Sequence, residues 1–220
     1  MPEKLRLRFS KTGRAVYLSH LDLMRTMQRA FLRAGYQLKY SEGFNPHAQI
    51  SILLPLSVGC ASVCELMDFQ LTEDVDLSDL PARLTVAMPE GIEAQEAYPA
   101  ELKSKYLKWL RITGRFEYDT RDLAEMAEAL RAFYARDSIV ITRKTKRGMG
   151  EMDIKPAIRE IHISPDADCV RVEAVISAQE PTLNPDHLVS ALRQLDERIA
   201  PDFAAFRREA VYQEDGGVFR

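Results

Sequence analysis

The stretch Ser19-His-Leu-Asp-Leu-Met-Arg-Thr-Met-Gln-Arg-Ala-Phe-Leu-Arg-Ala-Gly35 predicts the first helix of the protein. Its apolar residues recur every three or four positions and share one face. These residues are Leu23, Met27, Ala30, Phe31 and Ala34. Ser19, followed three residues later by Asp22, resembles a capping box, and Gly35 ends the helix. The alternating segment Leu5–Phe9 before it has the pattern of a half-buried strand, so the chain begins as an α+β fold.

The same order of elements occurs twice along the chain. The first copy continues with strand pieces at residues 37–40 and 50–54, strands at 65–71 and 92–97, and a helix at 77–87. The second copy has strands at residues 108–118, 138–143, 169–177 and 206–212, helices at 120–135 and 185–199, and an inserted extended segment at 153–164. We expect Thr120 and Asn184 to be the N-caps of those two helices.

This repeated β-α-β-β-α-β order predicts an α+β protein with tandem ferredoxin-like (βαββαβ) domains. The first domain is expected at residues 1–100 and contains the unusual loop described below. The second is expected at residues 101–220, with a basic loop and the inserted segment. The linker between them is expected near residues 99–105.

Charge is segregated along the 220 residues, although the net charge is only −3. It is +6 over residues 1–60, −8 over 61–100, +5 over 101–150 and −6 over 151–220. A local basic surface is therefore compatible with an acidic protein. No apolar run reaches the length of a membrane span, and the N-terminus lacks the apolar core of a signal peptide. We expect a cytoplasmic protein without membrane contact.

The three cysteines, Cys60, Cys64 and Cys169, do not form an even disulfide framework, which favours a reducing compartment. Cys60-x3-Cys64 resembles part of the Cys-x3-Cys-x2-Cys run by which radical S-adenosylmethionine (radical SAM) enzymes hold an iron–sulfur cluster, but position 67 is methionine. Two thiolates are also too few for a structural zinc site. We therefore expect neither a metal nor a cofactor in this chain.

The segment Tyr40-Ser-Glu-Gly-Phe-Asn-Pro-His47 predicts a rigid turn that offers side chains for recognition. Gly43 can take a positive φ, and Pro46 fixes φ and disfavours helix at the residue before it. We call residues 40–47 the recognition loop. Its candidate contact residues are Tyr40, Ser41, Gly43, Phe44, Asn45, Pro46 and His47.

Two sets of basic residues are candidates for contact with RNA phosphates. The first lies on the first helix, opposite its apolar face: Arg25, Arg29 and Arg33. The second precedes a Gly-rich turn: Arg143, Lys144, Lys146 and Arg147. Either set is also what a solvated helix face or hairpin tip contains. Asp153 and Lys155 form a further motif, which is either a recognition arm or a packed flap.

Two histidines are candidates for acid–base chemistry, because imidazole titrates near neutral pH. His20 lies at a helix start and His47 in the recognition loop. If they met, they could cleave RNA without a metal. No spacing in the sequence brings them together, and capping or hydrogen bonding is the alternative role.

Three segments resemble a bacterial family of unknown function that is associated with radical SAM proteins. They are Tyr17-Leu-Ser-His-Leu-Asp-Leu-Met24, the recognition loop, and Leu54-Pro-Leu-Ser-Val-Gly59, and the Asp153-Ile-Lys-Pro run fits as well. The family domain stands alone or is fused to a cobalamin-binding-like radical SAM protein. Ala48 departs from the proline expected there, and Cys64-Glu-Leu-Met-Asp68 departs from an expected Glu-Tyr-Leu-Asp.

The resemblance implies that a radical SAM partner holds the iron–sulfur cluster and S-adenosylmethionine. We therefore expect a non-catalytic partner that binds tRNA or rRNA and presents it for modification. One alternative is a protein–protein docking subunit without RNA contact. A second alternative is a metal-independent ribonuclease that uses His20 and His47.

Overall fold

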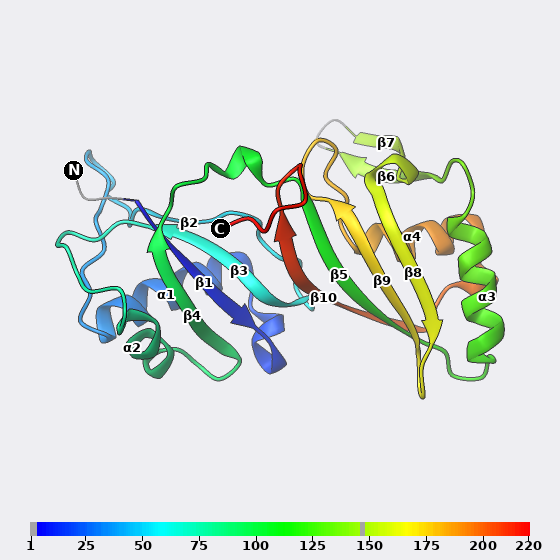
Figure 1. Ribbon diagram of the computed structural model, residues 1–220, viewed down its shortest axis with the longest axis horizontal. Helices are drawn as coiled ribbons and strands as arrows, with labels where there is room; N and C mark the ends of the chain where they lie inside the picture. Colours follow the sequence, from blue (N-terminus) through cyan, green and yellow to red (C-terminus); the bar gives the residue numbers. More distant parts are fainter. Residues whose placement is uncertain (1–3, 146–147) are drawn as a thin grey trace. The chain divides into compact units, whose positions relative to one another are not determined.

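The computed structural model describes residues 4–145 and 148–220, which form two compact units (Figure 1). Unit 1 comprises Met1–Tyr106 with Arg220, and unit 2 comprises Leu107–Phe219. The described residues contain four α-helices, and the strands within each unit pair antiparallel, which confirms the α+β class. In this described part of the chain, no helix is long and apolar enough to cross a membrane.

Unit 1 contains one sheet and two helices. In chain order its elements are β1 (Leu5–Lys11), α1 (His20–Arg33), β2 (Ile50–Ile52), β3 (Ala61–Phe69), α2 (Leu80–Ala87) and β4 (Ile92–Pro99). The strands lie in the order β4-β1-β3-β2. The strand expected at residues 37–40 is reduced to two isolated bridges, Leu38 with Leu71 and Tyr40 with Ala48.

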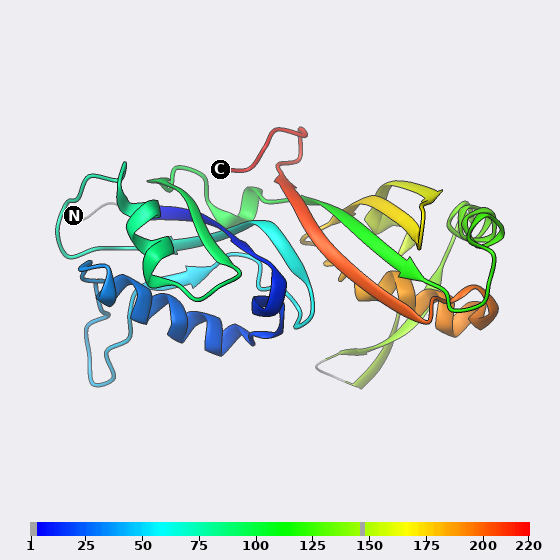
Figure 2. The same ribbon diagram turned by 90° about the horizontal axis from the view of Figure 1, so that it is seen from below.

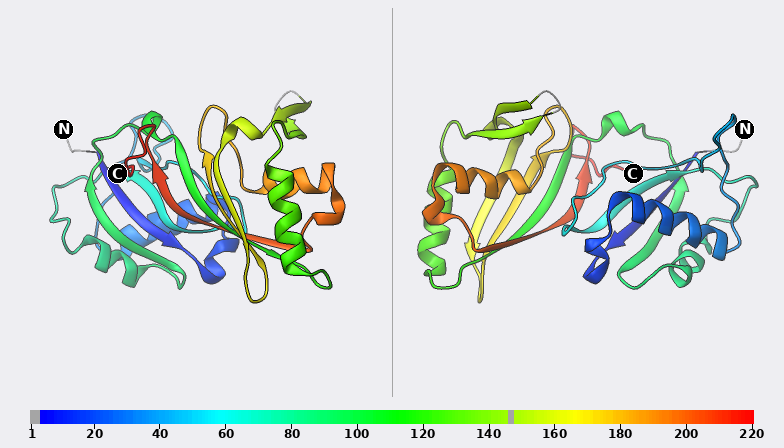
Figure 3. Two further views of the ribbon diagram at one scale, coloured as in Figure 1. Left: turned by 45° about the vertical axis from the view of Figure 1, so that its right-hand side comes forward. Right: turned by 180° about the vertical axis from the view of Figure 1, so that it is seen from behind.

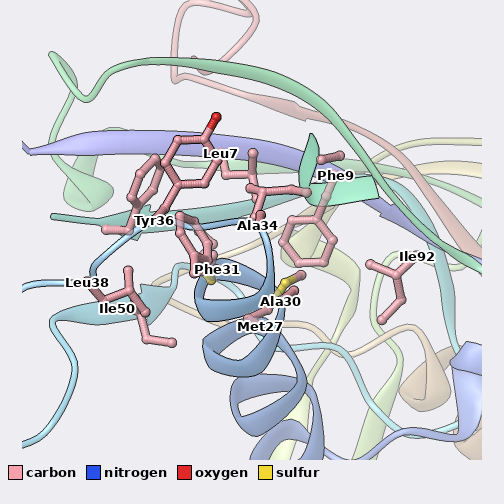
Figure 4. Close-up of a cluster of buried hydrophobic side chains, with 14 of the residues drawn as sticks. Leu7, Phe9, Met27, Ala30, Phe31, Ala34, Tyr36, Leu38, Ile50 and Ile92 are labelled. Atoms are coloured by element: carbon pink, nitrogen blue, oxygen red, sulfur yellow. The ribbon is translucent and has the colours of Figure 1, made fainter. Parts of the chain in front are cut away.

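The core of unit 1 lies between this sheet and its helices (Figure 4). Alternate residues of β1, Leu7 and Phe9, meet the apolar face of α1, whose five expected core residues are all buried. Phe31 packs on Phe69 of β3 with ring centroids 5.0 Å apart. The Ser19 hydroxyl accepts a hydrogen bond from the Asp22 N–H at 3.2 Å, so the expected N-cap is confirmed.

Unit 2 has a sheet, two helices and a separate hairpin. In chain order its elements are β5 (Trp109–Glu117), α3 (Leu123–Tyr134), β6 (Val140–Thr145), β7 (Gly148–Asp153), β8 (Ile158–Pro165), β9 (Val170–Ser177), α4 (Asp186–Leu195) and β10 (Phe203–Tyr212). The sheet order is β10-β5-β9-β8, and β6 pairs with β7. The helices α3 and α4 lie on one face of this sheet (Figure 1; Figure 3, right).

Several local predictions in unit 2 need correction. Asp122, not Thr120, is the N-cap of α3, because its carboxylate accepts the N–H groups of Ala124 and Glu125, both at 2.9 Å. Pro185, not Asn184, is the N-cap of α4, although Asn184 accepts the Asp186 N–H at 3.1 Å. The helix also ends earlier than expected, at Leu195, and a short 3-10 helix follows. The segment 153–164 is not an inserted arm: it holds the end of β7, a 3-10 turn and most of β8, which belongs to the main sheet. The strand expected at residues 138–143 lies instead in the separate β6–β7 hairpin.

Candidate nucleic-acid interface

The face of the unit 2 sheet that points away from α3 and α4 presents polar and aromatic side chains to solvent. Along β5, Leu110, Ile112 and Phe116 are buried, whereas Arg111 and Arg115 between them are exposed. Successive strand residues point to opposite faces, so Trp109 and Thr113 share the open face with these arginines. The open face is therefore built by the polar half of an alternating strand.

Strand register places an aromatic pair at one end of this face. Tyr212 of β10 lies directly opposite Trp109 of β5. The Arg159 guanidinium of β8 lies 5.5 Å from the centroid of the Trp109 ring, within the range of a cation–π contact. Two rings and a guanidinium plane, the groups on which unpaired bases stack, are thus grouped at one edge of the face.

A pocket lies beside Tyr212 on the open face. Val175 on β9, which stands opposite Arg111, is one of its lining residues. The pocket has a volume of about 580 Å³, which is within the range of small-molecule sites. Its polar walls are formed by Arg111, Arg159, Glu160, His162, Glu173 and Tyr212.

The charges around the pocket are balanced rather than uniformly basic. Arg111 and Glu173 are 3.9 Å apart and both side chains are 40% or more exposed. Arg159 is 4.0 Å from its neighbour Glu160, again at an exposed position. Exposed ion pairs of this kind contribute only about 0–1 kcal/mol. Both guanidinium groups can therefore exchange these carboxylates for a ligand anion at little cost.

Farther along the face the arginines are held more firmly. Arg115 donates to Asp168 through both terminal nitrogens, at 3.0 and 2.7 Å, and to Glu117 at 2.8 Å. These bonds lower the pKa of the Asp168 carboxyl. Arg171 donates to one carboxylate oxygen of Asp166 through Nε, at 3.2 Å, and through a terminal nitrogen, at 2.5 Å. The pocket end of the face is consequently where exchangeable arginines lie beside aromatic rings.

A pattern in the sequence indicates this surface, although none of the predicted site residues belongs to it. The expected strand at residues 108–118 alternates apolar residues with Trp109, Arg111, Thr113 and Arg115. That alternation marks an amphipathic strand with an aromatic–basic face. Its partners Tyr212 and Arg159 come from strands about 100 and 50 residues away, respectively, so only the register assembles the site.

The arginines expected on α1 have mostly structural contacts. Arg33 donates to the carbonyl oxygen of Ala87, the last residue of α2. Arg25 lies 3.5 Å from Asp22 in an exposed ion pair. Arg29 is exposed and lines a shallow groove next to Arg33. All three residues are exposed, so their contact with RNA stays a prediction.

The basic hairpin is described only in part. Arg143 is half-buried and Lys144 is exposed, both on β6, whereas Lys146 and Arg147 lie outside the described residues. The Gln194 side chain of α4 accepts the Thr142 N–H at 2.8 Å and donates to the Thr142 carbonyl at 3.0 Å. These two bonds attach β6 to α4. A phosphate-binding role for this hairpin stays a prediction.

Asp153 and Lys155 hold the hairpin to the end of α3. The Asp153 carboxylate accepts the N–H groups of Ile139 and Lys155 at 2.9 and 3.0 Å. The Lys155 ammonium donates to the Tyr134 carbonyl at 2.5 Å. Both side chains are thus used inside unit 2, which favours the packed-flap interpretation of this motif.

The recognition loop is closed by mutual hydrogen bonds between its ends. The Ser41 hydroxyl lies 2.9 Å from Nδ1 of His47, accepts the His47 N–H at 3.1 Å, and the Ser41 N–H donates to the His47 carbonyl at 2.9 Å. Gly43 has a φ of 121°, a conformation that disfavours side chains. Phe44 at the tip is fully exposed, and Tyr40, Asn45 and Pro46 are also exposed.

The structure does not bring His20 and His47 together. His20 is the first residue of α1, and Lys11 at the end of β1 donates to the nearby Leu18 carbonyl at 3.2 Å. His47 is close to Ile50, which pairs with the opposite end of β3. The recognition loop and the start of α1 lie at opposite ends of unit 1 (Figure 2). Since β3 is 9 residues long, the two imidazoles are roughly 20 Å apart or more. The acid–base pair required by the ribonuclease hypothesis is not formed.

All three cysteines are buried, and none of them is in a disulfide. Burial lowers the pKa of the Lys11 ammonium, and the nearby charges of Glu65 and Cys60 oppose that shift without reversing it. Among the residues described, no three or more His, Cys, Asp or Glu side chains are grouped as metal ligands.

Comparison with known proteins gives a family and no activity. A family model described as an uncharacterized protein conserved in bacteria (DUF2344) matches residues 4–185. No curated protein matches the chain. The crystal structure of an unknown protein from Galdieria sulphuraria is 12% identical, covers 94% of this chain and 99% of that chain, and has a TM-score of 0.27. A TM-score at that level supports no inference.

Proposed function

We propose that this chain, which belongs to the DUF2344 family of uncharacterized proteins conserved in bacteria, is a non-catalytic protein that binds single-stranded RNA on the open face of the unit 2 sheet. The observation that carries the proposal is the Trp109–Tyr212 pair beside a pocket rimmed by Arg111 and Arg159. Aromatic rings stack on any base, and arginines neutralise phosphates.

The strand orders support a finer reading of the fold. Both β4-β1-β3-β2 and β10-β5-β9-β8, with two helices on one face, are compatible with tandem ferredoxin-like domains. Four-stranded sheets of this kind bind RNA in the RRM, where aromatic residues on the open face stack two or three bases. This comparison is an analogy between folds, and the site residues carry the argument.

The proposed role is to present the bound RNA to a radical SAM protein. Support for that partner comes from the sequence resemblance at residues 17–24 and 40–47. In this proposal the partner supplies the iron–sulfur cluster and S-adenosylmethionine, and this chain supplies RNA affinity.

Fluorescence anisotropy with a labelled 12-nucleotide single-stranded RNA tests the binding function. We expect the double variant Trp109→Ala, Tyr212→Ala to bind about 10-fold more weakly or worse, because each stacked base contributes about 1–3 kcal/mol. Phe44→Ala, which removes an exposed aromatic ring from unit 1, is the matched control and should bind normally. Equal affinity of the double variant and the wild-type protein would refute the proposal.

A second candidate function, docking to a protein partner, is favoured by one observation. The Ser41–His47 bonds fix the recognition loop, and its tip carries the fully exposed Phe44. A rigid aromatic side chain at a tip is suited to insert into a partner's pocket. The two functions are compatible, because the loop and the open sheet face belong to different units.

A further inference from the structure

The pocket beside Tyr212 contains carboxylates, which phosphate binding alone does not explain. Glu160 and Glu173 line it together with Arg111 and Arg159. An ionised carboxylate only accepts hydrogen bonds, and it repels phosphate. These carboxylates are paired with Arg111 and Arg159, so when the arginines turn to phosphates the carboxylates become acceptors for N–H donors of the ligand.

Strand register places Glu173 on an inner strand of the sheet, where it lines the pocket. Glu173 lies on β9 between His162 of β8 and Thr113 of β5. Its side chain is 40% exposed and is 3.9 Å from Arg111. Glu160 is on the edge strand and its side chain is 70% exposed. Glu173 is thus the better positioned acceptor, and Glu160 lies at the rim.

Guanine is the base whose chemistry fits one carboxylate. Its Watson–Crick edge presents two adjacent donors, N1–H and the 2-amino group, in the spacing of the two carboxylate oxygens. Adenine and cytosine place an acceptor nitrogen next to their amino group, and uracil places carbonyl oxygens on both sides of its N–H. Only guanine therefore forms two parallel hydrogen bonds with a carboxylate without opposing lone pairs.

We infer that this pocket holds an unpaired guanine of the bound RNA, with Glu173 accepting from its N1–H and 2-amino groups. Val175 on the pocket floor gives the base an apolar contact, and Tyr212 borders it. Arg111 then exchanges its long contact with Glu173 for a neighbouring phosphate. The inference rests on the proposed RNA binding and adds the preferred base to it.

The test compares ten-nucleotide oligouridines that carry one central guanosine, inosine or adenosine, or none, by fluorescence anisotropy. Inosine keeps N1–H but lacks the 2-amino group. We expect the guanosine oligomer to bind about 5- to 100-fold more tightly than oligouridine, and inosine to lose most of that gain. Equal binding of the guanosine and inosine oligomers overturns the inference.

Two variants test whether Glu173 causes the preference for guanosine. Glu173→Gln replaces one acceptor oxygen by a donor, so the guanosine preference should be lost while affinity for oligouridine is kept or rises. Glu128→Gln, an exposed glutamate on α3 outside the pocket, is the control and should keep the preference. A preference that survives Glu173→Gln, or that is lost equally in Glu128→Gln, overturns the assignment. If the wild-type protein binds no RNA, the proposed function fails as well; if it binds every oligomer equally, only this inference fails.

Discussion

Arg33 and Arg83 cap each other's helices in unit 1. Arg33, at the end of α1, donates to the Ala87 carbonyl at the end of α2. Arg83 of α2 donates to the Ala34 carbonyl, at 2.7 Å, just past the end of α1. Each cation thus satisfies a free carbonyl at the negative end of the neighbouring helix. The pair joins the two helices that cover the unit 1 sheet.

Removing either cap should destabilise unit 1. We expect Arg33→Ala and Arg83→Ala each to lower the free energy of unfolding by about 0.5–1.5 kcal/mol, the net contribution of a typical hydrogen bond, because both side chains are exposed. Arg29→Ala, one turn before Arg33 on the same helix, should change it by less than about 0.5 kcal/mol. Urea titrations followed by circular dichroism give these values. Similar losses for Arg29 and Arg33 would contradict a specific capping role.

Asp153 should make stability depend on pH in the acid range. Hydrogen bonds from the N–H groups of Ile139 and Lys155 lower the pKa of its carboxyl below 3.8. The stabilising contribution is therefore complete above pH 3.8 and is lost as the pH falls through the lower pKa of the folded state. Asp153→Asn keeps an acceptor oxygen but cannot titrate. The difference in free energy of unfolding between the wild-type protein and this variant should shrink below pH 4. A difference that stays constant from pH 2.5 to 7 would contradict this prediction.

Salt should weaken RNA binding only modestly. Arg111 and Arg159 are the two exchangeable cations at the pocket, and the protein has a net charge of −3. Two phosphate contacts to a single strand give a slope of log K against log salt of about −1.4. Anisotropy titrations from 50 to 300 mM KCl measure it. A slope steeper than about −4 would indicate that the basic hairpin or the α1 arginines form the main contact instead.

Phe44 should matter for partner binding and not for folding. Its ring is fully exposed, so Phe44→Ala should leave the unfolding curve unchanged. Removing an anchor costs about 2 kcal/mol or more, which is about 30-fold in affinity. The measurement is a titration against the radical SAM protein that we propose as the partner. Tyr17→Ala, which removes a second exposed aromatic ring from the 3-10 helix before α1, is the control, and equal losses for both would argue against the loop.

Local patterns were sufficient to predict much of the fold. The 3.6-residue period at Leu23, Met27 and Phe31 predicted α1 and its buried face, because a helix lays these side chains on one side. The N-cap of α3 was missed because Thr120 and Asp122 are both good caps, and only geometry distinguishes them. The extended segment at 153–164 was misread because Pro156 sits inside a 3-10 turn that local pattern does not distinguish from a strand end.

The candidate site was much less predictable. Basic residues on one helix face, such as Arg33, are visible in the sequence, but their carbonyl partners depend on helix packing. Trp109 and Tyr212 are 103 positions apart, and only the β5–β10 register makes them neighbours. Charge clusters and motifs are contiguous in the sequence, whereas the residues of the open face come from four separate strands.

The most direct test of RNA binding at the open face is to locate the contact itself. Single-stranded RNA containing 4-thiouridine and guanosine can be crosslinked to the protein by long-wavelength light, and the attached peptides identified by mass spectrometry. The account predicts crosslinks to the segments around Trp109 and Tyr212, suppressed in the Trp109→Ala, Tyr212→Ala variant. Crosslinks confined to residues 25–33 or to the hairpin strands β6 and β7 would contradict it.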